Sequence, residues 1–285
     1  MTKPTVPVSI IAANYNNGAF LEAFINSIID SSTLPEELII VDDGSTDNSQ
    51  EILNAYSHLP YLRTILFDSN QGFTNSLNAA LQAATCKYVM RADPDDLLYP
   101  QRIEKQYEYL EHHPDTDLLG SNAVYFDSDT EKTINKSNFP LTHHEIVKTY
   151  RKGEHGLLHA TVCGKRSVYQ QYRYQQFSPG EDYELFSRMV MDGHHFANLD
   201  EALYKVRVHP SSSTSTLGRE GIARTFRFRD QTFGTRTSKL RIWFYYNYIR
   251  NYRNYQLSRN IIFRHFYLFL AILSYPSKLL KRLKG

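Results

Sequence analysis

Three carboxylates occur within four residues in the segment Asp93-Pro94-Asp95-Asp96. Carboxylates this close together repel one another unless a cation is present. Hard oxygen ligands of this kind suit Mg²⁺ or Mn²⁺, which bind through one or two carboxylates together with the phosphates of a substrate. The other interpretation is a solvated turn whose aspartates cap the next helix. The segment by itself favours the turn, so its surroundings decide between the two.

Polar clusters also follow other short apolar segments in the first half of the chain. They are Asn14-Tyr15-Asn16 after residues 8–12, Asp42-Asp43-Gly44-Ser45 after 38–41, and Asn70-Gln71-Gly72 after 62–67; the acidic segment itself follows 88–90. Apolar residues at helical spacing separate these runs, for example over 20–29 and 74–84. Strands that alternate with single helices form a parallel sheet covered on both faces, and ligands bind at the carboxyl ends of its strands. The clusters therefore predict one site along one sheet edge, with a metal–diphosphate site at residues 93–96.

The second acidic cluster, Asp42-Asp43, has two interpretations that the residues alone leave open. A carboxylate at this place can accept a hydrogen bond from the ring N–H of uracil or thymine. It can equally belong to a strand-to-helix turn in which Thr46 or Asp47 caps the helix that follows.

The second half of the chain is less regular. The patterns predict a helix over residues 100–112, strands at 118–126, 161–163 and 202–208, and a helix that opens at 180–185. The polar stretch 127–155 gives no assignment. The serine- and threonine-rich segment 211–216 is the expected hinge before the C-terminal part.

The order and spacing of several segments between residues 6 and 210 resemble the inverting family-2 glycosyltransferases of the GT-A fold. The segments are 8–17, 37–47, 70–72, 90–96, 100–102 and 180–185. The resemblance implies a GT-A catalytic domain over residues 1–215, with a Rossmann-like, mostly parallel α/β sheet flanked by helices. Its nucleotide-binding half would cover about 1–100 and its acceptor half about 100–215. The implied activity is transfer of a sugar from a nucleotide diphosphate, with UDP-hexose or UDP-N-acetylhexosamine favoured over dTDP-rhamnose.

The resemblance also implies roles at matching positions. Asp43 would hold the nucleobase in a pocket shared with Tyr15 and Asn14. Asp95 would be the main metal ligand, assisted by Asp93 and by His209, with Mn²⁺ or Mg²⁺ as the ion. The remaining substrate-binding positions would be Asn70, Arg91, His159 and Glu181. The family often has an arginine where this chain has Leu77, so Arg91 or Arg207 would supply the positive charge for the diphosphate.

An inverting transfer needs a base, because an acceptor hydroxyl has a pKa far above 7. At the position of the family's base the chain has Asp182, the second acid of Glu181-Asp182. At the start of a helix, backbone N–H groups and the helix dipole keep such a carboxylate ionised. The alternative is an acid pair that only stabilises the helix N-terminus.

The C-terminal part has a different composition from the rest. Residues 219–285 contain fifteen Lys and Arg and two acids, a local charge of +13 (15 − 2) in a chain of net charge +2. Basic residues with Trp, Tyr and Leu at helical spacing predict a helical appendage over 216–285 that lies on an anionic membrane surface. Its longest uncharged apolar stretch, 266–275, is too short to span a bilayer, which needs ~20 residues. Packing on the catalytic domain and a homodimer interface are the alternatives; nucleic acid is disfavoured because no recognition motif is present.

The remaining expectations concern location and class. The first residues show no signal peptide, and Cys86 and Cys163 read as free thiols, so we expect a cytoplasmic protein peripheral to the inner face of the cell membrane. A surface polysaccharide or lipid-linked glycan would be the acceptor. The competing functions are a phosphoryl- or nucleotidyl-transfer enzyme and a non-catalytic, membrane-attached sugar-binding protein.

Overall fold

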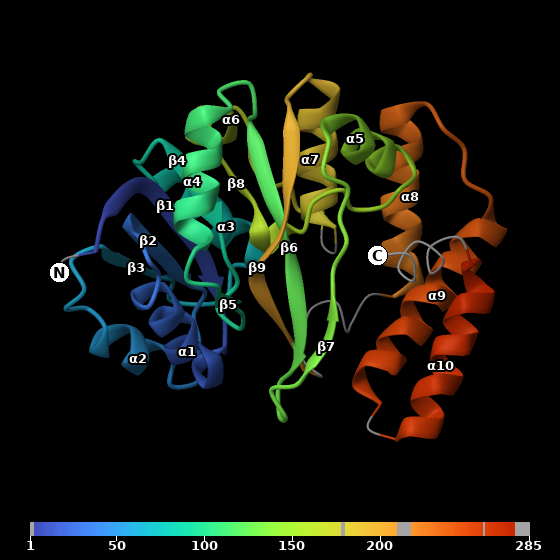
Figure 1. Ribbon diagram of the computed structural model, residues 1–285, viewed down its shortest axis with the longest axis horizontal. Helices are drawn as coiled ribbons and strands as arrows, with labels where there is room; N and C mark the ends of the chain where they lie inside the picture. The colour runs from blue at the N-terminus through green and yellow to red at the C-terminus, as the bar shows by residue number, and fades with distance from the viewer. Residues whose placement is uncertain (1–2, 178–179, 210–217, 259, 277–285) are drawn as a thin grey trace.

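The computed structural model describes residues 3–177, 180–209, 218–258 and 260–276, and these form one nine-stranded sheet with helices on both faces (Figure 1). The strands are β1 Thr5–Asn14, β2 Leu34–Asp42, β3 Leu62–Leu66, β4 Tyr88–Arg91, β5 Leu97–Leu98, β6 Leu118–Asp127, β7 Thr133–Lys136, β8 Cys163–Lys165 and β9 Phe196–Val208. The helices are α1 Gly18–Ile29, α2 Ser49–Ala55, α3 Phe73–Ala83, α4 Arg102–His112, α5 His143–Arg151, α6 Arg166–Tyr169, α7 Glu181–Met191, α8 Arg219–Phe233, α9 Lys239–Leu257 and α10 Ile261–Ser274, with the 3-10 helix η1 His159–Thr161.

The first four long strands form the parallel half of the sheet, in the order β3-β2-β1-β4. Side chains alternate between its faces, so that Ile10 packs under α1, α2 and α4 while Ile11 packs under α3 and α7. The register pairs Asn14 with Asp42 at the carboxyl ends of β1 and β2. The predicted parallel sheet is confirmed, and its strand ends meet at one edge.

The second half of the sheet is mixed. Strand β8 is antiparallel to both β4 and β6, β9 is parallel to β6, and β5 and β7 are antiparallel additions. The strand predicted over residues 161–163 begins two residues later, as β8, because the Thr161 N–H bonds to the Leu158 carbonyl (2.9 Å) and the Val162 N–H to the His159 carbonyl (3.1 Å) in the turn of η1. The unassigned stretch 127–155 contains β7 and α5, and the strand predicted over 202–208 begins six residues earlier, at Phe196.

The C-terminal helices divide into two parts. Helix α8 packs on α7 and α5, where the Phe228 ring lies 5.2 Å from Phe177 and Phe226 fills the space above Gly153. Helices α9 and α10 form an antiparallel pair beside it, packed through Tyr248 and Ala271 (Figure 1). Helix α8 therefore follows the alternative prediction for the C-terminal part, packing on the catalytic region. The expected hinge at 211–216 and the basic residues after 276 lie outside the described residues.

No helix in the described part of the chain combines the length and the apolar character that crossing a membrane requires.

Candidate active site

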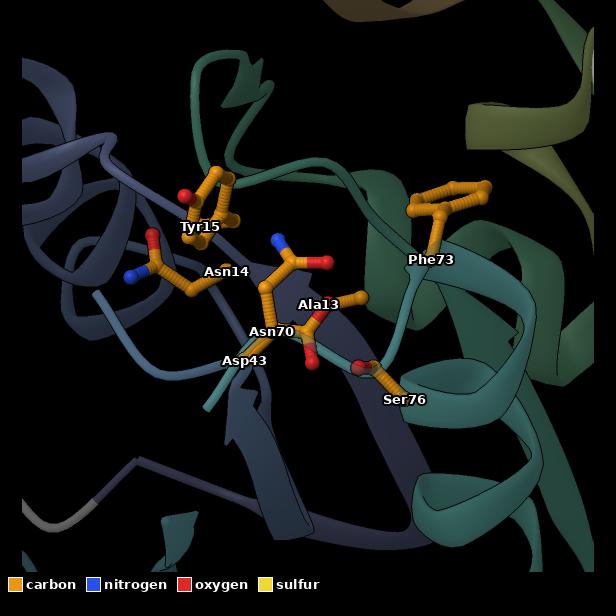
Figure 2. Close-up of a pocket in the computed structure, with 7 residues that line it drawn as sticks. All are labelled: Ala13, Asn14, Tyr15, Asp43, Asn70, Phe73 and Ser76. Carbon is orange, nitrogen blue, oxygen red and sulfur yellow. The ribbon is translucent and has the colours of Figure 1, made fainter. Parts of the chain in front are cut away.

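A pocket lies at the carboxyl ends of β1 and β2, where the sequence placed the nucleobase. It is lined by Ala13, Asn14, Tyr15, Asp43, Asn70, Phe73 and Ser76. Figure 2 shows Tyr15 and Phe73 on either side of this pocket, with Asn70 between them. The structure thus brings together four predicted residues from three separate strand ends: Asn14, Tyr15, Asp43 and Asn70.

The Asp43 carboxylate organises one wall of the pocket. Its two oxygens accept hydrogen bonds from the backbone N–H groups of Gln71 (2.7 Å) and Gly72 (2.9 Å). The neighbouring Gly44 has φ +72°, and a Cβ there would come within 2.6 Å of the Ser69 backbone. Glycine is required at this turn because any side chain would push the two loops apart. The Asp43 carboxylate therefore connects the turn after β2 to the loop after β3 at the pocket wall.

Asn14 lies beneath the pocket and links the two strand ends. Its amide Nδ2 donates to Asp42 Oδ2 at 2.7 Å, and the side chain is fully buried. Its Oδ1 is buried with no hydrogen-bond partner among the described residues. The Asn14 amide therefore ties β1 to β2 at the edge of the pocket.

The three aspartates of the acidic segment make different contacts. Asp93 pairs with the buried guanidinium of Arg91, and Asp96 Oδ1 accepts from the Arg207 backbone N–H at 2.8 Å. Burial raises the pKa of both the Asp93 and the Asp96 carboxyls, and the negative charge of Asp95 raises both further. The positive charge of Arg91 lowers the pKa of Asp93 in part. A cation bound beside these carboxyls would favour their charged forms and lower both pKa values.

The third aspartate faces the predicted metal-binding histidine. Asp95 Oδ2 lies 3.0 Å from Nε2 of His209, which follows β9. Among the described residues, no group of three or more His, Cys, Asp or Glu side chains could hold a metal by itself. Asp95 and His209 are therefore the pair that could contribute ligands to an ion here, with Asp93 turned toward Arg91.

The predicted base stands at the first turn of α7. Gly180, with φ +110°, turns the chain into this helix, and the acid side chains follow directly. Asp182 Oδ2 lies 3.1 Å from Nδ1 of His155. Burial would raise the pKa of Asp182, but the charge and hydrogen bond of His155 outweigh it, so the pKa lies well below the usual range. Burial and the Asp182 charge raise the pKa of Glu181 to about 7.

His159 connects the pocket to this carboxylate. Its ring is packed against Phe73 at 6.5 Å, and its Nε2 lies 2.7 Å from the Tyr174 hydroxyl. Burial and the nearby Arg91 charge lower the pKa of His159 to about 3, so the ring is neutral at pH 7. Arg91 in turn lies 5.3 Å from the centre of the Phe73 ring. Contacts through Phe73, Arg91 and His159 thus link the pocket with the acidic segment and with Asp182 at the start of α7.

Comparison with known proteins identifies the enzyme class. Residues 9–173 match the family model described as Glycosyl transferase family 2. The chain belongs to glycosyltransferase family 2. The putative glycosyltransferase EpsE of Bacillus subtilis is 34% identical over 216 residues, which cover 70% of this chain and 72% of that protein. The amylovoran biosynthesis glycosyltransferase AmsE of Erwinia amylovora is 31% identical over 188 residues, or 66% of this chain and 70% of the relative.

Solved structures show the same fold in other glycosyltransferases. S. aureus TarS 1–349 in complex with UDP-GlcNAc has a TM-score of 0.64 at 17% identity, over 89% of this chain and 74% of TarS. The mannosyltransferase PcManGT from Pyrobaculum calidifontis, in complex with GDP-Man and Mn²⁺, has a TM-score of 0.59 at 15% identity, over 100% of this chain and 80% of PcManGT. The predicted GT-A fold of this family-2 glycosyltransferase is confirmed.

Family membership also decides between the functional classes. The protein is a nucleotide-sugar glycosyltransferase, so the phosphoryl-transfer and non-catalytic alternatives are set aside. The individual roles of the site residues stay predictions.

The donor set of this glycosyltransferase fits the predicted ion. Mg²⁺ and Mn²⁺ bind through few protein ligands and complete their shells with water and substrate phosphates. A carboxylate and an imidazole, as in Asp95 and His209, leave room for a diphosphate. Arg207, whose Nε donates to the Asp95 carbonyl at 2.9 Å, adds positive charge at the same place. Leu77, where the family often has an arginine, is fully buried.

The sequence did not predict a role for His155, which contacts the predicted base of this glycosyltransferase. It lies in the stretch that gave no assignment, and nothing in its neighbours marks it. The one local signal is Thr142 with Glu145, a capping pair that begins α5 and would have placed a loop after residue 151. Only the fold brings that loop to α7.

Proposed function

We propose that the enzyme transfers a hexose or N-acetylhexosamine from UDP to a hydroxyl of a glycan or lipid-linked glycan, with inversion at the anomeric carbon. What supports this is the nucleobase pocket, whose Phe73 contacts Arg91 of the acidic segment and His159, together with the Asp95–His209 pair and the buried carboxylate of Asp182. The UDP-GlcNAc in TarS supports a UDP donor, while the GDP-Man in PcManGT and dTDP-rhamnose define the alternatives to test.

The nucleotide end of the donor occupies the pocket of Figure 2. Tyr15, which is 44% exposed, lies against the face of the base, and Asn14 lines the pocket beside it. Asp43 has lone pairs left beyond its two backbone bonds and takes a ring N–H. Asn70 and the neighbouring loop close over the ribose.

The acceptor hydroxyl attacks the anomeric carbon from the face opposite the diphosphate. Its proton passes to the Asp182 carboxylate, the new C–O bond forms, and the bond to the diphosphate breaks with its electron pair on the departing oxygen. Asp95 and His209, with Asp93 through water, would hold Mn²⁺ or Mg²⁺, which as a Lewis acid neutralises charge on the leaving diphosphate. Arg91 and Arg207 add fixed positive charge nearby.

This function is tested by turnover of UDP-, dTDP- and GDP-sugars with Mn²⁺, Mg²⁺ or EDTA, measured as nucleotide release with oligosaccharide or lipid-linked acceptors. The product's anomeric configuration is read by NMR. We expect release from a UDP-sugar only with metal, and inversion. A retained configuration or preference for a GDP- or dTDP-sugar would contradict the proposal.

Replacing Tyr15 by Ala is expected to weaken UDP binding about 10-fold, because stacking of a base on an aromatic ring contributes ~1–3 kcal/mol. Isothermal titration calorimetry with UDP measures the effect. Tyr15→Phe is the matched control, since it keeps the ring and should keep the affinity. Equal loss in both variants would assign the effect to the hydroxyl and refute stacking.

The same proposal includes attachment to the inner, cytoplasmic face of the cell membrane through residues 219–285. Helix α10 presents a stripe of exposed apolar side chains spaced i, i+4, i+7, i+11, on the side away from the buried Ala271. They are Ile262 (74% exposed), Phe266 (52%), Phe269 (55%) and Leu273 (57%). An apolar helix face in a segment of charge +13 fits an anionic lipid surface. Among the described helices of this segment, α8 packs on the catalytic region and α9 is bonded to it through Arg241, so α10 offers the face for this contact.

Changing Phe266 and Phe269 together to Ser is expected to reduce binding to phosphatidylglycerol vesicles at least ~10-fold, since each buried Phe contributes ~1.5–3 kcal/mol. Vesicle co-sedimentation measures it, and turnover with a soluble acceptor should not change. His265→Ser on the same helix is the control. Unchanged vesicle binding together with loss of a dimer in light scattering would make this face a subunit interface instead.

A further inference from the structure

The loop after α5 brings a histidine to the predicted base. His155 Nδ1 lies 3.1 Å from Asp182 Oδ2, with the His155 side chain 42% exposed and that of Asp182 16%. The His155 ring also meets the Tyr183 ring edge-on at 5.6 Å. Helices α5, α7 and α8 stand side by side at this place (Figure 1). Thus His155 approaches the carboxylate from the solvent side of α7.

The loop has little freedom to move. At Gly153, with φ +82°, a Cβ would come within 2.6 Å of the Phe226 ring of α8, and at Gly156 within 2.8 Å of Ile146. Asn198 Nδ2 donates to the Gly156 carbonyl at 2.9 Å. Close packing at these two glycines and the Asn198 bond therefore fix both ends of the short segment that contains Glu154 and His155.

The C-terminal helices fix the same loop from its other side. Arg241 of α9 donates from Nη2 to the Lys152 carbonyl at 3.0 Å, and Arg229 of α8 from Nη1 to the Arg151 carbonyl at 3.4 Å. Tyr183 of α7 donates to the Tyr150 carbonyl at 2.6 Å. These bonds from three helices hold the C-terminal end of α5, from which the loop with His155 continues.

Several other ionisable groups face Asp182. Glu181 repels it from the same turn of α7, Tyr150 faces it from α5, and Tyr174 from the segment before α7. His159 faces it from η1 but is bound to the Tyr174 hydroxyl and neutral at pH 7. His155 is the neighbour whose ring nitrogen lies within hydrogen-bond distance of the carboxylate.

We propose that His155 is a positioning residue for the transfer, donating its Nδ1–H to Asp182 so that the carboxylate is oriented and ionised when the acceptor binds. This inference rests on the proposed function, in which Asp182 takes the acceptor proton. A histidine that orients a carboxylate base in this way acts through hydrogen bonding and through charge. It touches neither the donor nor the acceptor.

The test is the pH dependence of kcat/KM. Burial raises the pKa of Asp182 and His155 lowers it, so removing His155 raises that pKa and less of the base is ionised at acid pH. In His155→Ala we expect the acid limb to move up by about one pH unit or more. At pH 7, kcat should fall about 10-fold, with an unchanged KM for the UDP-sugar.

His155→Asn provides the second variant, because its amide N–H can replace the Nδ1 donor. It should return the acid limb toward that of the wild type. His58→Ala, an exposed histidine after α2, is the control. A fall in kcat with an unmoved acid limb would overturn the inference, as would wild-type kinetics in His155→Ala. An active Asp182→Asn enzyme would instead remove the proposed base itself, so the two failures are distinguishable.

Discussion

An Asp182→Asn enzyme is expected to lose about 10²–10⁴ in kcat while it binds UDP as tightly as the wild type. That range is what a positioned base contributes to a transfer of this kind. The amide cannot take the acceptor proton, but it fills the same space at the first turn of α7. Steady-state kinetics with the UDP-sugar measure the loss, and calorimetry with UDP measures binding.

Glu181 is the competing base for this prediction. Its pKa of about 7 is close to the value that favours proton transfer at neutral pH. If Glu181→Gln lowers kcat by as much as about 10³-fold while the Asp182→Asn enzyme stays active, Glu181 is the base. Asp192→Asn, at the C-terminal end of the same helix, controls for a general effect on α7.

Replacing Asp95 by Ala is expected to lower kcat roughly 10²–10³-fold and to raise the Mn²⁺ concentration needed for half-maximal rate. Neutralising charge on the diphosphate contributes several kcal/mol, and each 1.36 kcal/mol is tenfold in rate. His209→Ala should act in the same direction with a smaller effect, because one carboxylate remains. Rates across a Mn²⁺ titration measure both.

The control for the metal prediction is Asp115→Asn, an exposed carboxylate in the turn before β6. It should leave the metal titration unchanged. Full activity of Asp95→Ala in EDTA would show that the transfer needs no ion at this pair.

The parallel half of the sheet and its nucleotide pocket were predictable for a physical reason. Strand and helix signals there are local, and parallel strands bring their carboxyl ends to one edge whatever the details of packing. Asn14, Asp43 and Asn70 could therefore be placed together from their positions after successive apolar runs. Asp95 and His209 are different, because residues 114 positions apart meet only through the pairing of β5 with β9.

The features that the sequence did not predict depend on contacts that leave no pattern in the neighbouring residues. His155 reaches Asp182 because two tight glycine positions and helix α8 fold the loop back, and none of these contacts shows in the residues around it. The strand expected at residues 161–163 begins only at Cys163, because backbone hydrogen bonds close a short turn over residues 159–161 first. The position of His155 thus depends on tertiary contacts, whereas the start of β8 depends on a local turn.

The anchoring of the loop at residues 151–152 by Arg229 and Arg241 bears on how the enzyme matures during synthesis. The sheet and the nucleotide pocket are encoded by residues that leave the ribosome first. The backbone anchors of the loop beside Asp182 belong to α8 and α9, which are made last. A nascent chain can thus form its nucleotide pocket early, whereas the transfer machinery is complete only once translation has passed residue 241.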